Sequence, residues 1–310
     1  MSTESVTTIK RLAAEAGYAS CGVTSTEPFR EFENALRDRM RWFPEAAHLY
    51  AALSEKLDHP TSAPWARSII VCVRRYGKYA IPNGLDAYFG RYYLFDRRIK
   101  PCPDYRIAGR FEAALNQLGL RVQRGGVPYR WAGARAGITR FGKNCFAYSE
   151  HGSWIDFDAW LVDVNLPADT PTLESVCPED CRVCIDACPT GALAGPFVMR
   201  RDLCIAHLTY EAPTPIASHL WERMGSWIYG CDVCQRACPM NRGMWEPLES
   251  AEWLEEIADD LSPSALSAMD LQTYRTKVQP YFWYISVDNL ARWHANAVRA
   301  LRHSADQTAP

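Results

Sequence analysis

The feature that most constrains this chain is a cysteine-rich stretch from Cys177 to Pro239, which holds eight of the twelve cysteines. It begins with C-P-E-D-C-R-V-C-I-D-A-C-P, passes an isolated Cys204, and ends with C-D-V-C-Q-R-A-C-P. The spacing C-x2-C-x3-C-P is the core of the bacterial ferredoxin pattern, in which neighbouring thiolates hold one [4Fe–4S] cluster and the cysteine before proline ligates the other. Because two such clusters need eight thiolates, the sequence predicts two [4Fe–4S] clusters.

This exchange of ligands divides the cysteines into two sets, each combining neighbouring thiols with distant ones. The first predicted set is Cys177, Cys181, Cys184 and Cys238, and the second is Cys188, Cys204, Cys231 and Cys234. In the second set, Cys204 supplies the thiolate that the shorter cysteine run lacks. Three residues, instead of the two in ferredoxins, separate Cys177 from Cys181, so Cys177 departs from the pattern.

Structural zinc and disulfides are the alternatives for these cysteines. Two C-x2-C pairs can bind zinc, but zinc explains neither the eight cysteines nor the two Cys-Pro endings. Disulfides are concentrated in secreted proteins, and residues Met1 to Lys10 lack a basic segment followed by an apolar one. We therefore expect a reducing, cytoplasmic environment.

The composition restricts the possible partners. The chain has 310 residues, of which 48% are hydrophobic, and no apolar run approaches the roughly 18 residues of a membrane span. A net charge of −2 indicates no general attraction to nucleic acid and leaves open a local basic face. We expect no membrane partner.

Apolar periodicity predicts a layered α/β domain over residues 1–170. Apolar residues recur with helical spacing from Ile9 to Gly17, where the glycine is expected to end the helix. Residues 31–53 are expected to be helical. The apolar run Ser68–Val73 predicts a central strand covered on both faces, with Cys72 as a buried thiol.

Further along, residues 104–118 have helical spacing, with Asp104 as a possible N-cap. Residues 18–23, 120–123 and 160–164 are predicted strands. The segment 88–100 mixes aromatic and basic residues, which is typical either of a solvated helix face or of the approach to an anionic ligand. Residues 171–245 are expected to form the cluster domain and residues 246–310 a C-terminal helical segment, with a last helix at 289–301.

Motifs along nearly the whole chain resemble those of epoxyqueuosine reductases, iron–sulfur and cobalamin-dependent enzymes that are related to reductive dehalogenases. The matching segments follow the order of that family, and 229–242 (Y-G-C-D-V-C-Q-R-A-C-P-M-N-R) is the most specific of them. The others are residues 9–18, 64–71, 104–105, 135–137, 141–144, 152–154 and 292–296.

The resemblance implies a nitroreductase-like α/β domain that binds cobalamin, a ferredoxin-like domain with two [4Fe–4S] clusters, and C-terminal helices. Electrons from an external donor such as ferredoxin or flavodoxin would pass through both clusters to cobalt, which would reduce a substrate. Asp104 would inherit the family's general-acid role, with Tyr105 and Arg106 beside it. Plain helix capping is the alternative for Asp104.

The resemblance also implies a set of corrin-binding candidates with backbone and short polar groups in suitable motifs. They are Arg135, Gly142, Lys143, Asn144, Ser153 and Trp154. A glycine turn with a solvated lysine is the alternative for residues 142–144, because the upstream glycine of a phosphate-binding loop is missing.

Two departures from the family lie where substrate or cofactor contacts are expected. Arg106 stands in place of a histidine, and residues 126–132 (G-V-P-Y-R-W-A) lack both acidic residues of the family segment. We therefore expect a reductase with a different, small-molecule substrate, with tRNA left open. The alternatives are an electron-transfer protein without cobalamin, a reductase using flavin or a cluster directly, and a true epoxyqueuosine reductase acting in tRNA modification.

Overall fold

The computed structural model describes residues 3–55 and 62–308 and divides the chain into two compact units. The first unit comprises residues 1–77, 103–182 and 195–198, and the second comprises residues 78–102, 183–194 and 199–310. None of the helices in the described residues has the length and apolar character that a membrane span requires. The division into domains at residues 170 and 245 stays a prediction.

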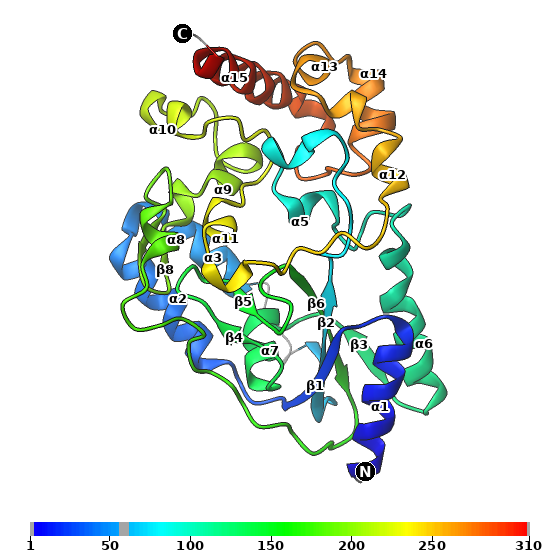
Figure 1. The fold of residues 1–310 in the computed structure, drawn as a ribbon. Helices are drawn as coiled ribbons and strands as arrows, with labels where there is room; N and C mark the ends of the chain where they lie inside the picture. Colours follow the sequence, from blue (N-terminus) through cyan, green and yellow to red (C-terminus); the bar gives the residue numbers. More distant parts are fainter. Residues whose placement is uncertain (1–2, 56–61, 309–310) are drawn as a thin grey trace. The chain divides into compact units, whose positions relative to one another are not determined.

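The first unit is built on a four-stranded antiparallel sheet with the order β1-β2-β6-β3 (Figure 1). The strands are β1 (Ser20–Ser25), β2 (Ser68–Arg75), β6 (Ile155–Val162) and β3 (Val122–Arg124). Every residue of β6 and all of β2 except Arg75 are buried. β2 and β6 are therefore the centre of the sheet.

Alternate residues of β2 face two different apolar cores. Ile70 and Cys72 pack with α1 (Thr3–Ala16) and α6 (Ile107–Gln117), which lie side by side (Figure 1). Ile69, Val71 and Val73 pack on the opposite face with α7 (Tyr129–Arg135). The prediction of a strand covered on both faces is confirmed.

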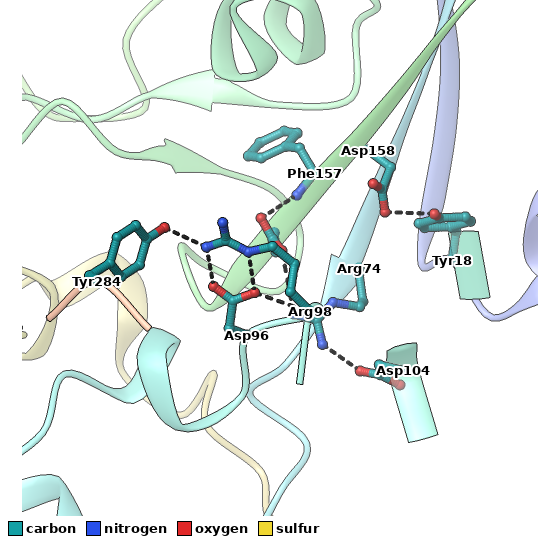
Figure 2. Close-up of polar contacts among 9 residues, drawn as sticks. Tyr18, Arg74, Asp96, Arg98, Asp104, Phe157, Asp158 and Tyr284 are labelled. Carbon is teal, nitrogen blue, oxygen red and sulfur yellow. Dashed lines mark hydrogen bonds and ion pairs between the residues drawn. The ribbon is translucent and has the colours of Figure 1, made fainter. Parts of the chain in front are cut away.

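The turn after α1 shows why glycine is needed there. Gly17 has φ +113°, a conformation that side-chain-bearing residues rarely adopt, and it ends the helix as predicted. The next residue, Tyr18, packs edge-on against Phe111 and Trp160 and donates a hydrogen bond to Asp158 at 2.7 Å (Figure 2). Burial, followed by contact with Cys21, raises the pKa of the Cys72 thiol, which is an interior residue as predicted.

The prediction that residues 31–53 are helical is confirmed, and the structure adds a break within the segment. The segment forms α2 (Arg30–Trp42), a 3₁₀ turn η1 (Pro44–Ala46) and α3 (Ala47–Glu55). Pro44 has no N–H to continue the hydrogen bonding of α2, so the chain turns there. The turn packs the two helices against each other through Leu36, Ala46 and Tyr50.

Two short strands complete the sheet structure of the first unit, β4 (Arg140–Phe141) and β5 (Ala147–Tyr148), which pair with each other. The β7 (Leu193–Gly195) and β8 (Val198–Met199) strands form a separate hairpin. A 3₁₀ turn, η3 (Pro103–Arg106), leads directly into α6.

The second unit consists mainly of short helices joined by loops. They are α5 (Arg91–Leu94), α8 (Val183–Asp186), α9 (Ile205–Tyr210), α10 (Ser218–Arg223), α11 (Val233–Arg236), α12 (Glu252–Glu255), α13 (Pro263–Ser267), α14 (Leu271–Thr273) and the long α15 (Leu290–Thr308). The predicted last helix is confirmed and extends beyond residue 301. It packs against α13 and α9.

Two leucines of α6 offer a matched test of the α1/α6 core. Leu115 is fully buried, whereas Leu118 at the end of the same helix is 41% exposed. We expect Leu115→Ala to lower the free energy of unfolding by about 2–5 kcal/mol, because it removes buried methyl groups and leaves a cavity. Leu118→Ala should change it by less than about 0.5 kcal/mol. Urea unfolding followed by tryptophan fluorescence measures both, and equal effects would contradict the assigned core.

Candidate iron–sulfur site

The four thiols of the second predicted set lie together in the second unit. Burial raises the pKa of the Cys204, Cys231 and Cys234 thiols, and mutual repulsion with one another and with Cys188 raises it further. Such repulsion requires the thiols to be neighbours. Because thiolates are the metal-binding form and bound metal cations drive deprotonation, this donor set fits a [4Fe–4S] cluster.

Short helices set the positions of these cysteines. Cys204 is the N-cap of α9, and Cys231 and Cys234 flank the start of α11. Gly230, just before Cys231, has φ +77°, and its N–H donates to Thr209 Oγ1 at 2.9 Å. A Cβ at residue 230 would lie 2.2 Å from the ring of Tyr93, so the close approach requires glycine.

Helix α15 binds the loops that carry Cys204 and Cys231. Asn296 donates to the carbonyl groups of Thr209 at 2.8 Å and of Ile228 at 3.0 Å. Arg292 donates to the carbonyl of Ala212 at 2.5 Å. Farther along the same face, Arg299 binds the carbonyls of residues 225 and 227, and burial lowers its pKa to about 10, which leaves it charged at neutral pH.

A group of four tyrosines, Tyr93, Tyr210, Tyr229 and Tyr284, adjoins the second cysteine set. The hydroxyls of Tyr93 and Tyr210 are 2.9 Å apart, and the ring of Tyr210 stacks on Tyr284 at 5.0 Å. Burial raises the pKa of Tyr210 to about 12, and the neighbouring Cys204 contributes in the same direction. The tyrosines therefore provide dry surroundings for this thiol. Sequence reasoning missed this group, although the aromatic segment 88–100 was its signal.

Two arginines of segment 88–100, Arg91 and Arg98, pair with the carboxylates of Asp86 and Asp96. Arg98 donates to both carboxylate oxygens of Asp96, at 2.9 and 2.6 Å, and also to the Tyr284 hydroxyl (Figure 2). Burial alone would raise the pKa of Asp96, but Arg98 outweighs it and the net shift is downward. Arg98 therefore holds Tyr284 against the tyrosine group.

The first predicted set is divided between the two units. Cys177 and Cys181 belong to the first unit, whereas Cys184 and Cys238 belong to the second. Cys177 Sγ accepts a hydrogen bond from Lys143 N at 3.3 Å, and Cys177 N donates to Ser175 Oγ at 3.0 Å. In the second unit, α8 and α11 pack together, and Cys184 shares a small apolar cluster with Cys188 and Cys234.

The part of the chain that the structure describes has no compact site for a single metal ion. Across residues 3–55 and 62–308, no three His, Cys, Asp or Glu side chains are grouped as closely as one metal ion requires. Zinc needs its ligands within about 2.0–2.3 Å. A four-iron cluster spreads its thiolates more widely, because iron and sulfide atoms lie between them.

Asp104 does not have the predicted N-cap geometry. The N-cap residue of α6 is Arg106, without a side-chain cap, and Asp104 lies in the preceding turn η3. Its buried carboxylate pairs with the buried Arg74 at 2.7 Å (Figure 2). Arg74 also contacts Asp156 at 3.4 Å. Tyr105 and Arg106 are exposed, so Asp104 is separated from its two neighbours. The charged Arg74, at the end of an apolar strand, was the overlooked signal.

The corrin-binding candidates all lie in the first unit, where their side chains have protein partners. Arg135 pairs with both carboxylate oxygens of Glu31, at 2.5 and 2.7 Å. Burial would raise the pKa of Glu31, but this arginine produces a net lowering. Asn144 donates to the Tyr148 hydroxyl at 2.8 Å, and Lys143 binds main-chain carbonyls.

The remaining candidates are equally enclosed. Ser153 and Trp154 are buried, and the carbonyl of Trp154 accepts hydrogen bonds from residues 76 and 77. A Cβ at Gly142 would lie 2.4 Å from the ring of Tyr148. These contacts do not single out a corrin site, and corrin binding by this set stays a prediction.

Residues 177–241 match the family model described as "4Fe-4S double cluster binding domain". The match covers all eight predicted ligands and supports two [4Fe–4S] clusters, as the cysteine spacing predicts. The match also includes Cys177, despite its unusual spacing.

Relatives and structural neighbours of the chain include several epoxyqueuosine reductases. The epoxyqueuosine reductase of Xanthomonas campestris pv. campestris is 31% identical over 257 residues, covering 77% of this chain and 71% of that protein. The structure of epoxyqueuosine reductase from Streptococcus thermophilus has a TM-score of 0.78 at 22% identity, covering 97% of this chain and 82% of that one. A solved epoxyqueuosine reductase in complex with a modified tRNA-Tyr stem loop has a TM-score of 0.74 at 22% identity, with coverages of 97% and 81%. These matches confirm the predicted fold class. The chain belongs to the epoxyqueuosine reductase family of oxidoreductases.

Proposed function

We propose that this protein takes electrons from an external ferredoxin- or flavodoxin-type donor and passes them through two [4Fe–4S] clusters to reduce a bound substrate. The observation that carries the proposal is the gathering of Cys188, Cys204, Cys231 and Cys234 from separate segments of the second unit. A carrier of electrons alone would have no use for the large α/β unit that precedes the cysteines.

The surroundings of the second cysteine set support a strongly reducing cluster. A cluster gains negative charge on reduction, and a dry, aromatic environment disfavours that charge. The tyrosine group beside Cys204 supplies this environment, while the N–H of Val233 donates to Cys231 Sγ at 3.5 Å and acts in the opposite direction. These two opposing effects together set the reduction potential of the cluster, and this potential sets the driving force for substrate reduction.

Cobalamin is the proposed electron acceptor, on the strength of the sequence motifs at residues 141–144 and 152–154. A bound corrin would supply a reducible cobalt centre. The side chains of Arg135, Lys143 and Asn144 have protein partners, and main-chain groups of Gly142, Lys143 and Trp154 are hydrogen-bonded within the protein. The chain would therefore hold a corrin mainly through other residues.

Asp104 is the proposed proton donor, and Arg74 positions it. The ion pair at 2.7 Å fixes the carboxylate at the end of β2, while Asp156 holds the far side of the guanidinium. An acid that is held in one orientation loses less entropy when it meets a substrate. Tyr105 and Arg106 face solvent and are proposed to contact substrate as it enters.

We propose a small-molecule substrate in place of epoxyqueuosine in tRNA. Arg106 is exposed where the family has histidine, and residues 126–132, which lead into α7, carry no acidic side chain. The second candidate is epoxyqueuosine reduction in tRNA, which is favoured by the 31% identity to a reductase of that name.

Removing one ligand tests the cluster assignment. We expect Cys204→Ser to reduce the iron content of the anaerobically reconstituted protein from about eight to about four atoms per chain, because one four-iron cluster loses a ligand. Cys21→Ser, at a partly buried cysteine of β1 outside both sets, is the matched control and should leave iron unchanged. Unchanged iron in Cys204→Ser would contradict the assignment.

Corrin binding has a direct spectroscopic test. Protein reconstituted with iron, sulfide and cobalamin should retain the visible corrin absorption after gel filtration, at about one corrin per chain. Iron, sulfide and cobalt are quantified on the same fraction. Full cluster content without corrin would favour an electron-transfer protein without cobalamin. Flavin found by cofactor extraction would favour a reductase that uses flavin.

The substrate proposal is tested with tRNA that carries epoxyqueuosine. We expect no conversion to queuosine by the reduced protein, measured by nucleoside mass spectrometry, with the Xanthomonas relative as positive control. Conversion would overturn the small-molecule proposal and establish the second candidate.

In that case Asp104→Asn should lower the rate of epoxyqueuosine reduction by about 10²–10⁴-fold, the usual contribution of a general acid. Asp163→Asn, at an exposed site, should leave this rate unchanged.

A further inference from the structure

Lys143 is a buried lysine whose ammonium group is surrounded by main-chain carbonyls. Its Nζ donates to the carbonyl oxygens of Pro178 at 2.9 Å, of Cys181 at 3.0 Å, and of Glu179. An ammonium group has three N–H donors, so these carbonyls use all of them. The residue is only 7% exposed. The three acceptors span the whole loop from Cys177 to Cys181.

The main chain of Lys143 contacts the same loop. Its N–H donates to Cys177 Sγ at 3.3 Å, and its carbonyl accepts from Phe197 N at 2.9 Å. A single residue therefore binds the sulfur of the first cysteine and the peptide groups that follow it. Hydrogen bonds from N–H groups to cysteine sulfur are one of the means by which proteins adjust iron–sulfur clusters.

The turn that presents Lys143 is itself rigid. Gly142 N donates to the carbonyl of Phe146 at 2.8 Å, and Cys145 has φ +66°. Asn144 holds the turn to Tyr148 through its side-chain amide. The lysine therefore projects from a fixed support.

The segment that enters the loop is fixed from the other side. Val176 N donates to the carbonyl of Phe141 at 2.9 Å, and Ser175 pairs with Phe141 as an isolated bridge. Ser175 Oγ in turn accepts from Cys177 N. Both the lysine and the start of the loop are thus attached to the end of β4.

A buried cation is costly unless its surroundings compensate for it. Neutral carbonyls satisfy the hydrogen bonds of the ammonium group but leave its net charge. Thiolates and a cluster with net negative charge would compensate for this positive charge. The residues Pro178, Glu179 and Asp180 make this loop one residue longer than the ferredoxin spacing, and the extra peptide group needs an added partner.

We propose that Lys143 is the positioning residue for Cys177 and Cys181, two predicted ligands of the first cluster, since it organises the enlarged loop between them and places a positive charge beside that loop. The proposal deepens the proposed function and rests on it, because the cluster is the one assigned to these cysteines. Positive charge stabilises the reduced state, so Lys143 raises the potential of this cluster.

The experiment uses the full-length chain with Lys143→Met, which keeps the side-chain length and removes the charge and donors. Lys143→Arg keeps both. Lys10→Met is the matched control, since Lys10 makes a partly exposed ion pair with Asp169. After anaerobic reconstitution, iron and sulfide are counted and each cluster is titrated by EPR. In parallel, apo protein is digested with Glu-C, and cleavage after Glu179 is followed by mass spectrometry.

We expect Lys143→Met either to lose one cluster, giving about four iron atoms per chain instead of about eight, or to keep it at a lower potential. The EPR signal of the other cluster should be unchanged, and Glu-C should cut after Glu179 at least tenfold faster than in wild type. Lys143→Arg should give iron content, potentials and a Glu-C rate between those of Lys143→Met and wild type. Lys10→Met should give wild-type values for all three.

Normal iron content, potentials and Glu-C rate in Lys143→Met would overturn the proposal. If Lys143→Met does not fold, Lys143→Gln is tested in its place, because it keeps amide donors without the charge. Its iron content, cluster potentials and Glu-C rate then test the proposal in the same way. Wild-type protein that binds no iron would instead overturn the proposed function. The Glu-C rates of the apo proteins would still report whether Lys143 orders the loop.

Discussion

The structure depends on buried cations that bind main-chain carbonyl groups of the loops next to the cysteines. These loops have little regular secondary structure, so their peptide groups cannot all pair with one another. Lys143 does this for the loop after Cys177, and Arg292 and Arg299 of α15 do it for the segments that follow Cys204 and precede Cys231. These contacts fix the positions of the cysteines, which the short helices alone would not hold.

The same cations serve the chemistry of the site. Thiolates and iron–sulfur clusters carry negative charge into a low-dielectric interior, and fixed positive groups reduce that cost. The tyrosine group beside Cys204 acts in the opposite sense by excluding water. The positive charge of Lys143 beside the Cys177–Cys181 loop and the dry aromatic wall beside Cys204 would give the two proposed clusters different potentials.

Much of the fold could be predicted because its signals are local. The strand Ser68–Val73 and the glycine that ends α1 follow from residues that are adjacent in the chain. Local signals did not reveal where a single residue changes the path of the chain, as Pro44 does between the helices α2 and α3 of the predicted helical segment. They also failed where a side chain had a distant partner. Asp104 reads as a helix cap, yet it pairs with Arg74 across the interior.

The sequence by itself determined the ligand chemistry and the ferredoxin-type spacing, because cluster-binding thiols must lie in short runs with specific separations. It also determined the two-faced central strand, because side chains alternate along a strand. Only the tertiary structure decided what the charged side chains bind. Lys143 reads as a solvated or cofactor-binding lysine, but its acceptors lie more than thirty residues away, at Pro178 to Cys181. Which carbonyl or carboxylate meets a buried cation depends on how distant backbone segments pack, and no local pattern encodes that.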